Sequence, residues 1–291
     1  MLAEKANFSV GLMCRALGLS RSGFYAWLSR QRPSKKELED AKVVEAIREV
    51  HAASRGTYGS PRVVEALARR GLPTSRHRAA RLMREHGIRG RVRRRFRSTT
   101  DSSHSFEVAE NLLERRFSAD SSDVVWCADL TQVHTRSGPV YLAAIIDIGT
   151  RLIVGWSMAS HMRTELIERA LENALAWRDP AATLMHHSDR GSQYASGYFQ
   201  ALLEHHGITC SMSRKGNCHD NAVIESFFGT FKQEWANWQE WSGLDDARAS
   251  THDYVERFYN RERLHSTLGY RTPMEVDGEL LHVRTQHEVV A

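Results

Sequence analysis

Three acidic side chains of this 291-residue chain stand where carboxylates could act together. Asp129 interrupts an apolar run, VVWCADLTQV, that is typical of a buried strand. An unpaired charge is costly there, so a metal ion or a basic side chain should accompany it. Asp189 directly follows another apolar segment, in HHSDRGSQY, and Glu225 lies thirty-five intervening residues further on. Any one of these acids alone would most often be a surface carboxylate.

Converging carboxylates would suit the cleavage of a phosphodiester bond. This reaction needs an activated water and a stabilised leaving oxygen, and two Mg²⁺ ions about 3.5–4 Å apart supply both. Mg²⁺ prefers carboxylate and phosphate oxygens, so the site needs neither His nor Cys ligands. The three acids therefore suggest a site for two Mg²⁺ ions, in which Mn²⁺ is expected to substitute.

The acid Glu225 belongs to a stretch, 219–238, that is predicted to form one long helix. At 100° per residue, its polar side chains share one face with a glycine, namely Asn221, Glu225, Gly229 and Lys232. Its large apolar side chains fall on the side that would pack on a sheet, namely Ile224, Phe227, Phe231 and Trp235. We therefore expect an open polar face on which Asn221 and Lys232 contact DNA beside Glu225.

The elements that must position these acids alternate in a recognisable order. Strands are predicted at 124–133, 140–147 and 152–158, with short turns between them that favour an antiparallel meander. Helices and strands then alternate at 164–177, 182–187, 196–206, 208–212 and 219–238. This order predicts an α/β fold of the RNase H-like type, a mixed sheet with helices on both faces. In that topology the first and fourth strands are neighbours, so Asp129 and Asp189 can meet.

The first hundred residues have a different composition. They carry 23 Lys and Arg against 8 Asp and Glu, whereas the rest of the chain has 17 basic and 27 acidic residues. Such a basic half indicates nucleic-acid binding, although a solvated basic surface is the alternative.

This basic half is predicted to be all-helical. Residues 8–30 read as helix, turn and helix with Ser20 as an N-cap, and a second such unit ends in a helix from Ser75 to Gly87. Both units fit a helix-turn-helix plan. The expected DNA contacts are the arginines of the last helix and of the linker after it, namely Arg76, Arg78, Arg81, Arg84, Arg93, Arg94 and Arg95.

Composition also limits the class of protein. Apolar residues make up 41% and charged residues 26%, and no apolar run reaches the ~18–20 residues of a membrane helix. The four cysteines form no CxxC pair and no secretory signal is visible, so we expect a cytoplasmic protein. The expected parts are a helix-turn-helix-like segment (1–35), a DNA-binding region (36–90), a basic linker (91–118), a catalytic core (119–278) and a tail (279–291).

Six sequence blocks resemble one family. They are ALGLSRSGFYAW (16–27), YGSPRVVEALARRG (58–71), WCADLT (126–131), HHSDRGSQY (186–194), SRKGNCHDNAVIESFFGTFKQE (213–234) and YNRERLHSTLGYRTPMEV (259–276). Together they resemble the integrase-core transposases of bacterial insertion sequences, specifically the second-reading-frame product of insertion sequence family three. The resemblance covers nearly the whole chain.

The resemblance implies that Asp129, Asp189 and Glu225 are the catalytic acids, that two divalent metals assist them, and that the substrate is a DNA end. Retroviral integrases, which are similar in this core, place a lysine seven residues after the glutamate, and Lys232 fits. Bringing two ends together implies a homo-oligomer that binds double-stranded DNA. Family members usually act as a fusion with the upstream-frame product, which supplies a leucine zipper that this chain lacks.

Two other functions stay open at this stage. A DNA-binding regulator of transposition would need the basic half but not the acids, and a plain RNase H-type nuclease would need the acids but not the basic half. Among the remaining polar residues, we expect Asp147 to be structural and His187 and Ser188 to orient Asp189. Asp220 is expected to favour the start of the long helix, Arg263 and His265 to pack across the core or bind phosphate, and the cysteines to be buried.

Overall fold

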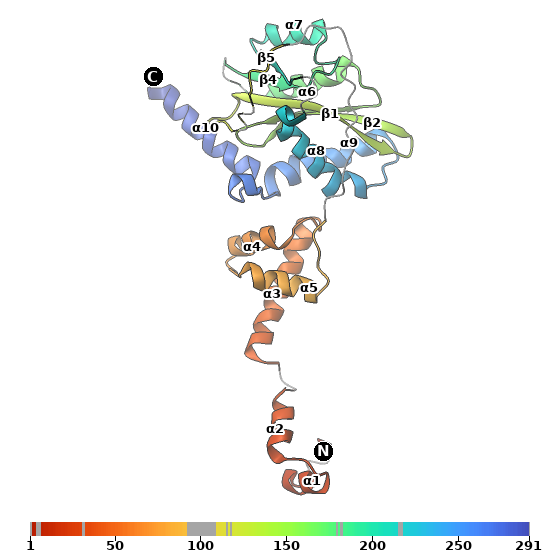
Figure 1. Ribbon diagram of the computed structural model, residues 1–291, viewed down its shortest axis with the longest axis vertical. Coiled ribbons are helices and arrows are strands. Elements are labelled where there is room, and N and C mark those ends of the chain that lie inside the picture. The colour runs from red at the N-terminus through yellow and green to blue at the C-terminus, as the bar shows by residue number, and fades with distance from the viewer. Residues whose placement is uncertain are drawn as a thin grey trace. The chain divides into compact units, whose positions relative to one another are not determined.

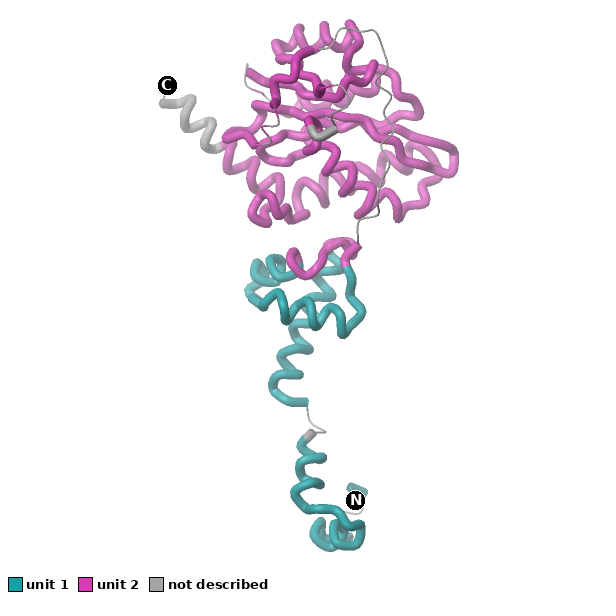
Figure 2. Tube along the Cα trace, viewed as in Figure 1, with its two compact units in different colours: residues 1–53, 63–89 teal, residues 54–62, 90–291 magenta. Residues whose placement is uncertain are grey.

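The computed structural model describes residues 2–3, 7–30, 33–91, 109–114, 116, 118–178, 180, 183–214 and 218–290. The chain forms two compact units, shown in different colours in Figure 2. One unit comprises residues 1–53 and 63–89, and the other comprises residues 54–62 and 90–291. Arg93, Arg94 and Arg95, which were expected to bind DNA, lie outside the described residues.

The chain up to residue 91 is helical, as predicted. Its helices are α1 (Val10–Ala16), α2 (Arg21–Arg30), α3 (Lys35–Ala53), α4 (Ser60–Arg69) and α5 (Arg76–Glu85) (Figure 1). Ser20 caps α2, because its Oγ accepts a hydrogen bond from the Gly23 amide at 2.9 Å. Ser75 caps α5 in the same way through the Arg78 amide at 3.2 Å. Both N-caps predicted from the sequence are confirmed.

The second unit contains a five-stranded sheet in the order β3-β2-β1-β4-β5. Its strands are β1 (Val125–Thr135), β2 (Gly138–Asp147), β3 (Ile153–Ala159), β4 (Met185–Ser188) and β5 (Thr209–Met212). The first three strands pair antiparallel, and β4 and β5 continue the sheet parallel to β1. The predicted meander and the predicted contact between the first and fourth strands are confirmed. The fourth strand begins later than expected, at Met185.

Helices cover both faces of this sheet. On one face, α6 (Thr164–Trp177) and α7 (Gly197–His205) form a hydrophobic core with Trp126 and Ala128 of β1. Because side chains alternate along a strand, Asp129 points to the other face, on which α8 (Ala222–Glu234) packs against β1 and β2. Figure 1 shows α7 and α8 on opposite sides of the sheet.

Close packing of α6 depends on Gly155 in β3. A Cβ atom there would collide with the carbonyl oxygen of Ala170 and the side chain of Ala174. Beyond α8, the chain continues through α9 (Leu244–His252), a π-helix (Asp253–Glu262) and α10 (Pro273–Val290). The boundary expected at residue 278 falls within α10, and the five-part division otherwise stays a prediction.

The single helix predicted for 219–238 is wrong. The structure has a 3₁₀ turn at Cys218–Asn221, then α8, then another 3₁₀ turn at Ala236–Trp238. The helix ends because Trp235 leaves the helical region, with φ −133° and ψ −71°, and its indole nitrogen donates to Ser250 Oγ at 3.0 Å. Among the described residues, no helix combines the length and apolarity needed to cross a bilayer.

Candidate active site

The register of the sheet places Asp129 and Asp189 side by side. Ala128 of β1 pairs with Ser188 of β4 in the parallel ladder, and each aspartate is the next residue along its strand direction. Both carboxylates are oriented by the backbone, since Asp129 Oδ1 accepts from the Leu130 amide at 2.7 Å and Asp189 Oδ1 accepts from the Gly191 amide at 2.9 Å. The two acids therefore lie at one position on neighbouring strands.

Glu225 approaches these acids from the first turn of α8, where it is exposed. The start of this helix is tied to β1, because Asn221 Nδ2 donates to the carbonyl oxygen of Ala128 at 3.0 Å. Asn221 is only 3% exposed, so the open face expected for the long helix does not extend to it. Its burial comes from a partner 93 residues away in the chain, which the helical pattern alone could not reveal.

The pKa of Asp129 is affected by the charges of Asp189, Glu225 and Lys232. Burial raises the pKa of Asp129 well above its usual value, and the charges of Asp189 and, more weakly, Glu225 raise it further. The Leu130 amide and the charge of Lys232 act in the opposite direction. Burial lowers the pKa of Lys232, partly offset by Asp129. The structure thus brings one lysine and three acids into one electrostatic cluster.

This cluster contains only oxygen donors among its acids, the type that Mg²⁺ prefers. Within the described part of the chain, no three His, Cys, Asp or Glu side chains lie close enough together to hold one metal ion. Burial is the largest cause of the raised pKa of Asp129, and repulsion by the charges of Asp189 and Glu225 raises it further. A divalent cation would remove this repulsion, so the donor set fits such an ion although the carboxylates would have to move closer to bind it.

Two other polar residues that the sequence singled out, His187 and Asp147, make structural contacts. His187 is buried, with Nδ1 2.8 Å from Ser211 Oγ and Nε2 3.2 Å from Ser213 Oγ, so it links β4 to β5. Burial lowers its pKa to about 4. Asp147 is fully buried and accepts from the Asp123 amide and from Thr150. The structural role expected for Asp147 is confirmed.

Asp220 does more than begin the helix. Its buried carboxylate accepts from Asn111 Nδ2 at 2.7 Å and from the Arg214 amide and guanidinium at 3.1 Å. Asp220 therefore links the turn just before α8 to the segments that contain Asn111 and Arg214.

The arginines of α5 divide into two kinds. Arg78 and Arg81 form ion pairs with Asp40 of α3 at 2.6 and 2.7 Å, so part of their function is to hold two helices together. Arg76 and Arg84 are exposed, and no ion pair is found for either among the described residues. Of the predicted DNA contacts on this helix, Arg76 and Arg84 are the side chains best placed to meet phosphates.

Arg263 and His265 pack against the sheet-containing unit, which was one of the two roles expected for them. Arg263 is buried and binds both carboxylate oxygens of Glu234 at 2.7 Å, and its Nη1 lies 3.3 Å from His265 Nε2. Cys14 and Cys127 are buried and Cys210 is partly buried.

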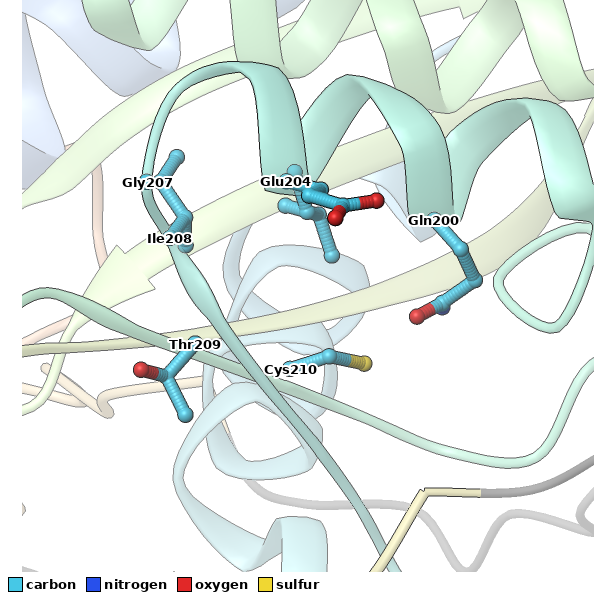
Figure 3. Close-up of a pocket in the computed structure, with 7 residues that line it drawn as sticks. Gln200, Glu204, Gly207, Ile208, Thr209 and Cys210 are labelled. Atoms are coloured by element: carbon cyan, nitrogen blue, oxygen red, sulfur yellow. The ribbon is translucent and has the colours of Figure 1, made fainter.

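A separate hollow of about 360 Å³ lies between α7 and β5 (Figure 3). It is lined in part by Gln200, Glu204 and Cys210, and none of the three acids borders it.

Comparison with protein families now identifies both parts of the chain. Residues 119–218 and 206–273 match two family descriptions of the integrase core domain, and residues 37–96 match an HTH-like domain. These matches, with the observed sheet, confirm the predicted integrase-type core of mixed strands and the helical region before it.

Relatives extend over almost the entire chain. It is 43% identical over 261 residues to the insertion element IS600 uncharacterized 31 kDa protein of Shigella sonnei, covering 90% of this chain and 96% of the relative. It is 36% identical over 279 residues to transposase InsF for insertion sequence IS3A of Escherichia coli, covering 96% and 97%.

A solved structure is also similar, the catalytic core domain of BIV integrase. It is 16% identical, with a TM-score of 0.42, and covers 56% of this chain and 99% of that domain. With 36% identity along nearly its full length to InsF and two integrase-core matches, the chain belongs to the integrase-core transposases of bacterial insertion sequences, enzymes of the polynucleotidyl-transferase kind.

Proposed function

We propose that this transposase cleaves the ends of its insertion element and joins them to target DNA, with Asp129, Asp189 and Glu225 as the catalytic acids. The observation that carries the proposal is the side-by-side placement of Asp129 and Asp189 by the pairing of β1 with β4, together with the charges of Asp189 and Glu225 that raise the pKa of Asp129. Neighbouring carboxylates repel one another, and the phosphate of a DNA substrate would add further negative charge. The site therefore needs a compensating positive charge. The same three acids therefore also support the use of divalent cations.

The chain's own groups have separable roles in this proposal. Asp129 and Asp189 are oriented by backbone amides and would supply two ligands from neighbouring strands, and Glu225 would complete the set from α8. When bound, two Mg²⁺ ions, or Mn²⁺ in their place, would activate the attacking oxygen and stabilise the leaving oxygen. Lys232, close enough to Asp129 to affect its pKa, would bind a phosphate of the DNA end. The buried Asn221 would have a positioning role, because its hydrogen bond fixes the start of α8 on β1.

DNA binding is assigned to the helical unit. Its HTH-like match and the exposed Arg76 and Arg84 support contact with duplex phosphates. Joining requires that two DNA ends be held together in one complex. We therefore propose that the active complex contains at least a dimer of this chain. We also propose that this chain acts as a fusion with the upstream-frame product.

The test is incubation of the purified chain, and separately of the two-frame fusion, with a labelled duplex of the element end and Mg²⁺. We expect strands cut at the element end and products joined to a second duplex, both abolished by a chelator. Binding of the duplex without any cut or joined product, in Mg²⁺ and in Mn²⁺ and for both proteins, would instead identify a regulator that binds DNA.

A further inference from the structure

Two short stretches, one that ends within the first turn of α4 and one that follows α5, belong to the compact unit that contains the sheet. They are residues 54–62 and residues 90–91 (Figure 2). Tyr58 is 4% exposed, and its hydroxyl donates to the carbonyl oxygen of Glu262 at 3.2 Å and accepts from the Leu264 amide at 2.7 Å. Arg62 Nε donates to the carbonyl oxygen of Leu264 at 2.9 Å. Residues 63–89, which form part of the HTH-like match, are therefore joined in the chain to stretches of this unit on both sides.

The attachment centres on Glu234, the last residue of α8. Its carboxylate is 4% exposed and binds Arg263 through two hydrogen bonds of 2.7 Å. The same carboxylate lies 3.8 Å from Arg62 Nη1, and it accepts from Tyr254 at 3.3 Å. One acid thus joins the tail of the core to the stretch 54–62.

Arg91 binds the same turn of α8 through its side chain and through its backbone carbonyl oxygen. Arg91 Nη1 donates to the carbonyl oxygen of Glu234, and Gln233 Nε2 donates to the carbonyl oxygen of Arg91 at 3.0 Å. The guanidinium of Arg55 lies 4.6 Å from the ring centre of Trp235, the residue at which the helix ends. Both flanking stretches therefore grip the C-terminal end of α8.

The gripped end is rigidly connected to the site. Glu225 lies nine residues before Glu234 on one helix, a separation of about 14 Å along the axis, and Lys232 lies within the last turn. The other end of α8 is held by the bond of Asn221 to β1. Because α8 is one continuous helix between these two attachments, a rotation of its C-terminal turn would change the orientation of Lys232 and Glu225 relative to Asp129.

We propose that Glu234 is a positioning residue that couples DNA binding by the helical region to the orientation of α8. This inference rests on the proposed function. Tension or ordering in the stretches 54–62 and 90–91, produced when DNA is held by the helices between them, acts on α8 through Glu234 and Arg62. The acid Glu225 then takes its working orientation only when DNA is bound.

The variants for testing this coupling leave the buried pair of Glu234 and Arg263 intact, because Glu234→Gln itself would strand a buried arginine and could unfold the core. Tyr58→Phe and Arg62→Gln, alone and combined, loosen only the flanking stretch. Glu240→Gln is the matched control, since Glu240 forms an ion pair with Arg136 in which the side chains are 80% and 72% exposed.

Three quantities are measured on each full-length protein: affinity for the labelled end duplex, amide hydrogen exchange of residues 222–234 with and without that duplex, and cleavage in Mg²⁺. We expect the combined variant to bind DNA within about twofold of the parent, since phosphate contacts remain. It should lose the DNA-induced protection of α8, and its cleavage should fall at least about tenfold through misplacement of Glu225. The control should match the parent in all three.

If DNA protects the amides of α8 from exchange in the combined variant as much as in the parent, the coupling is contradicted. A parallel loss of DNA binding and thermal stability would also contradict it, because it would show a merely structural role for these contacts. Failure of the proposed function is a separate result. If the parent binds DNA but never cleaves, the hydrogen-exchange comparison still decides whether DNA binding reaches α8 through this attachment.

Discussion

At the scale of single residues, Asp129 is the side chain on which the account depends most. It is oriented by the Leu130 amide, placed beside Asp189 by the strand register, and affected by the charges of Glu225 and Lys232. Its pKa is raised, first by burial and then by the neighbouring acids. Such a group is unfavourable for the stability of the metal-free fold and favourable for binding a cation.

This raised pKa predicts how Asp129→Asn changes stability. Because the pKa in the folded state exceeds that in the unfolded chain, the carboxyl group contributes stability fully below the unfolded pKa of about 3.9 and loses that contribution as pH rises through the folded pKa. In metal-free buffer at neutral pH, Asp129→Asn should therefore have a higher Tm than the parent, and the difference should shrink on acidification. Thermal unfolding across pH measures this.

Mg²⁺ provides the control for that experiment. It should raise the Tm of the parent by binding the folded state and should have little effect on Asp129→Asn. A variant that is less stable than the parent at neutral pH without metal would show that Asp129 is stabilised by its surroundings, contrary to the coupling described above.

The sequence could single out these acids as candidates because each has a local signal: Asp129 lies inside an apolar strand, Asp189 directly follows one, and Glu225 lies on the polar face of an amphipathic helix. It could not predict the burial of Asn221 or the pairing of Arg78 and Arg81 with Asp40. These contacts join residues 93, 38 and 41 positions apart, so no periodicity along one element reveals them. Glu234, similarly, reads as an ordinary residue near a helix end.

At the scale of elements, the order and pairing of the strands followed from hydrophobic patterning and turn signals. The end of α8 did not, since its apolar pattern continues to Trp235 and beyond, while Trp235 leaves the helical region and its indole binds Ser250 of α9. The close seating of α6 on the sheet likewise depends on Gly155, whose role is visible only once Ala170 lies above it.

The seating of α10 on the core depends on a buried arginine. Arg178, just after α6, binds Asp123 before β1 and Asp277 on α10, and the three residues are 7%, 1% and 2% exposed. Arg178→Met should destabilise the fold by about 3–5 kcal/mol, because two buried carboxylates lose their partner. Urea unfolding measures the change. Arg136→Met, at the exposed pair with Glu240, should cost under about 1 kcal/mol; equal effects of the two substitutions would contradict this role.

The division of the α5 arginines makes a prediction about DNA binding. Arg76→Ala and Arg84→Ala should each weaken duplex binding and reduce the salt dependence by about one counterion. Arg78→Ala should instead lower the stability of the helical unit, since it removes a bond to Asp40. Fluorescence anisotropy over a salt series, with thermal unfolding of the same proteins, separates the two effects. If Arg76→Ala and Arg84→Ala leave the salt slope unchanged, α5 does not contact phosphates.

At the scale of the whole molecule, charge and chemistry are assigned to different parts of the chain. The excess of basic residues lies in the first hundred residues, and the three acids lie in the sheet-containing unit. Affinity for DNA and cleavage of DNA should therefore be separable by mutation. A regulator that only binds DNA would need no coupled acids, which is why the site distinguishes it from an enzyme.

The most direct test of this account compares the parent with Glu225→Gln in cleavage and joining of labelled element ends in Mg²⁺, alongside duplex binding. Glutamine keeps the size of the side chain but removes its charge, so cleavage and joining should fall by about a thousandfold or more while binding stays near the parental value. Asp129→Asn and Asp189→Asn should behave alike, and combining them should not multiply the loss. Cleavage by Glu225→Gln at close to the parental rate would contradict the assignment of the catalytic acids.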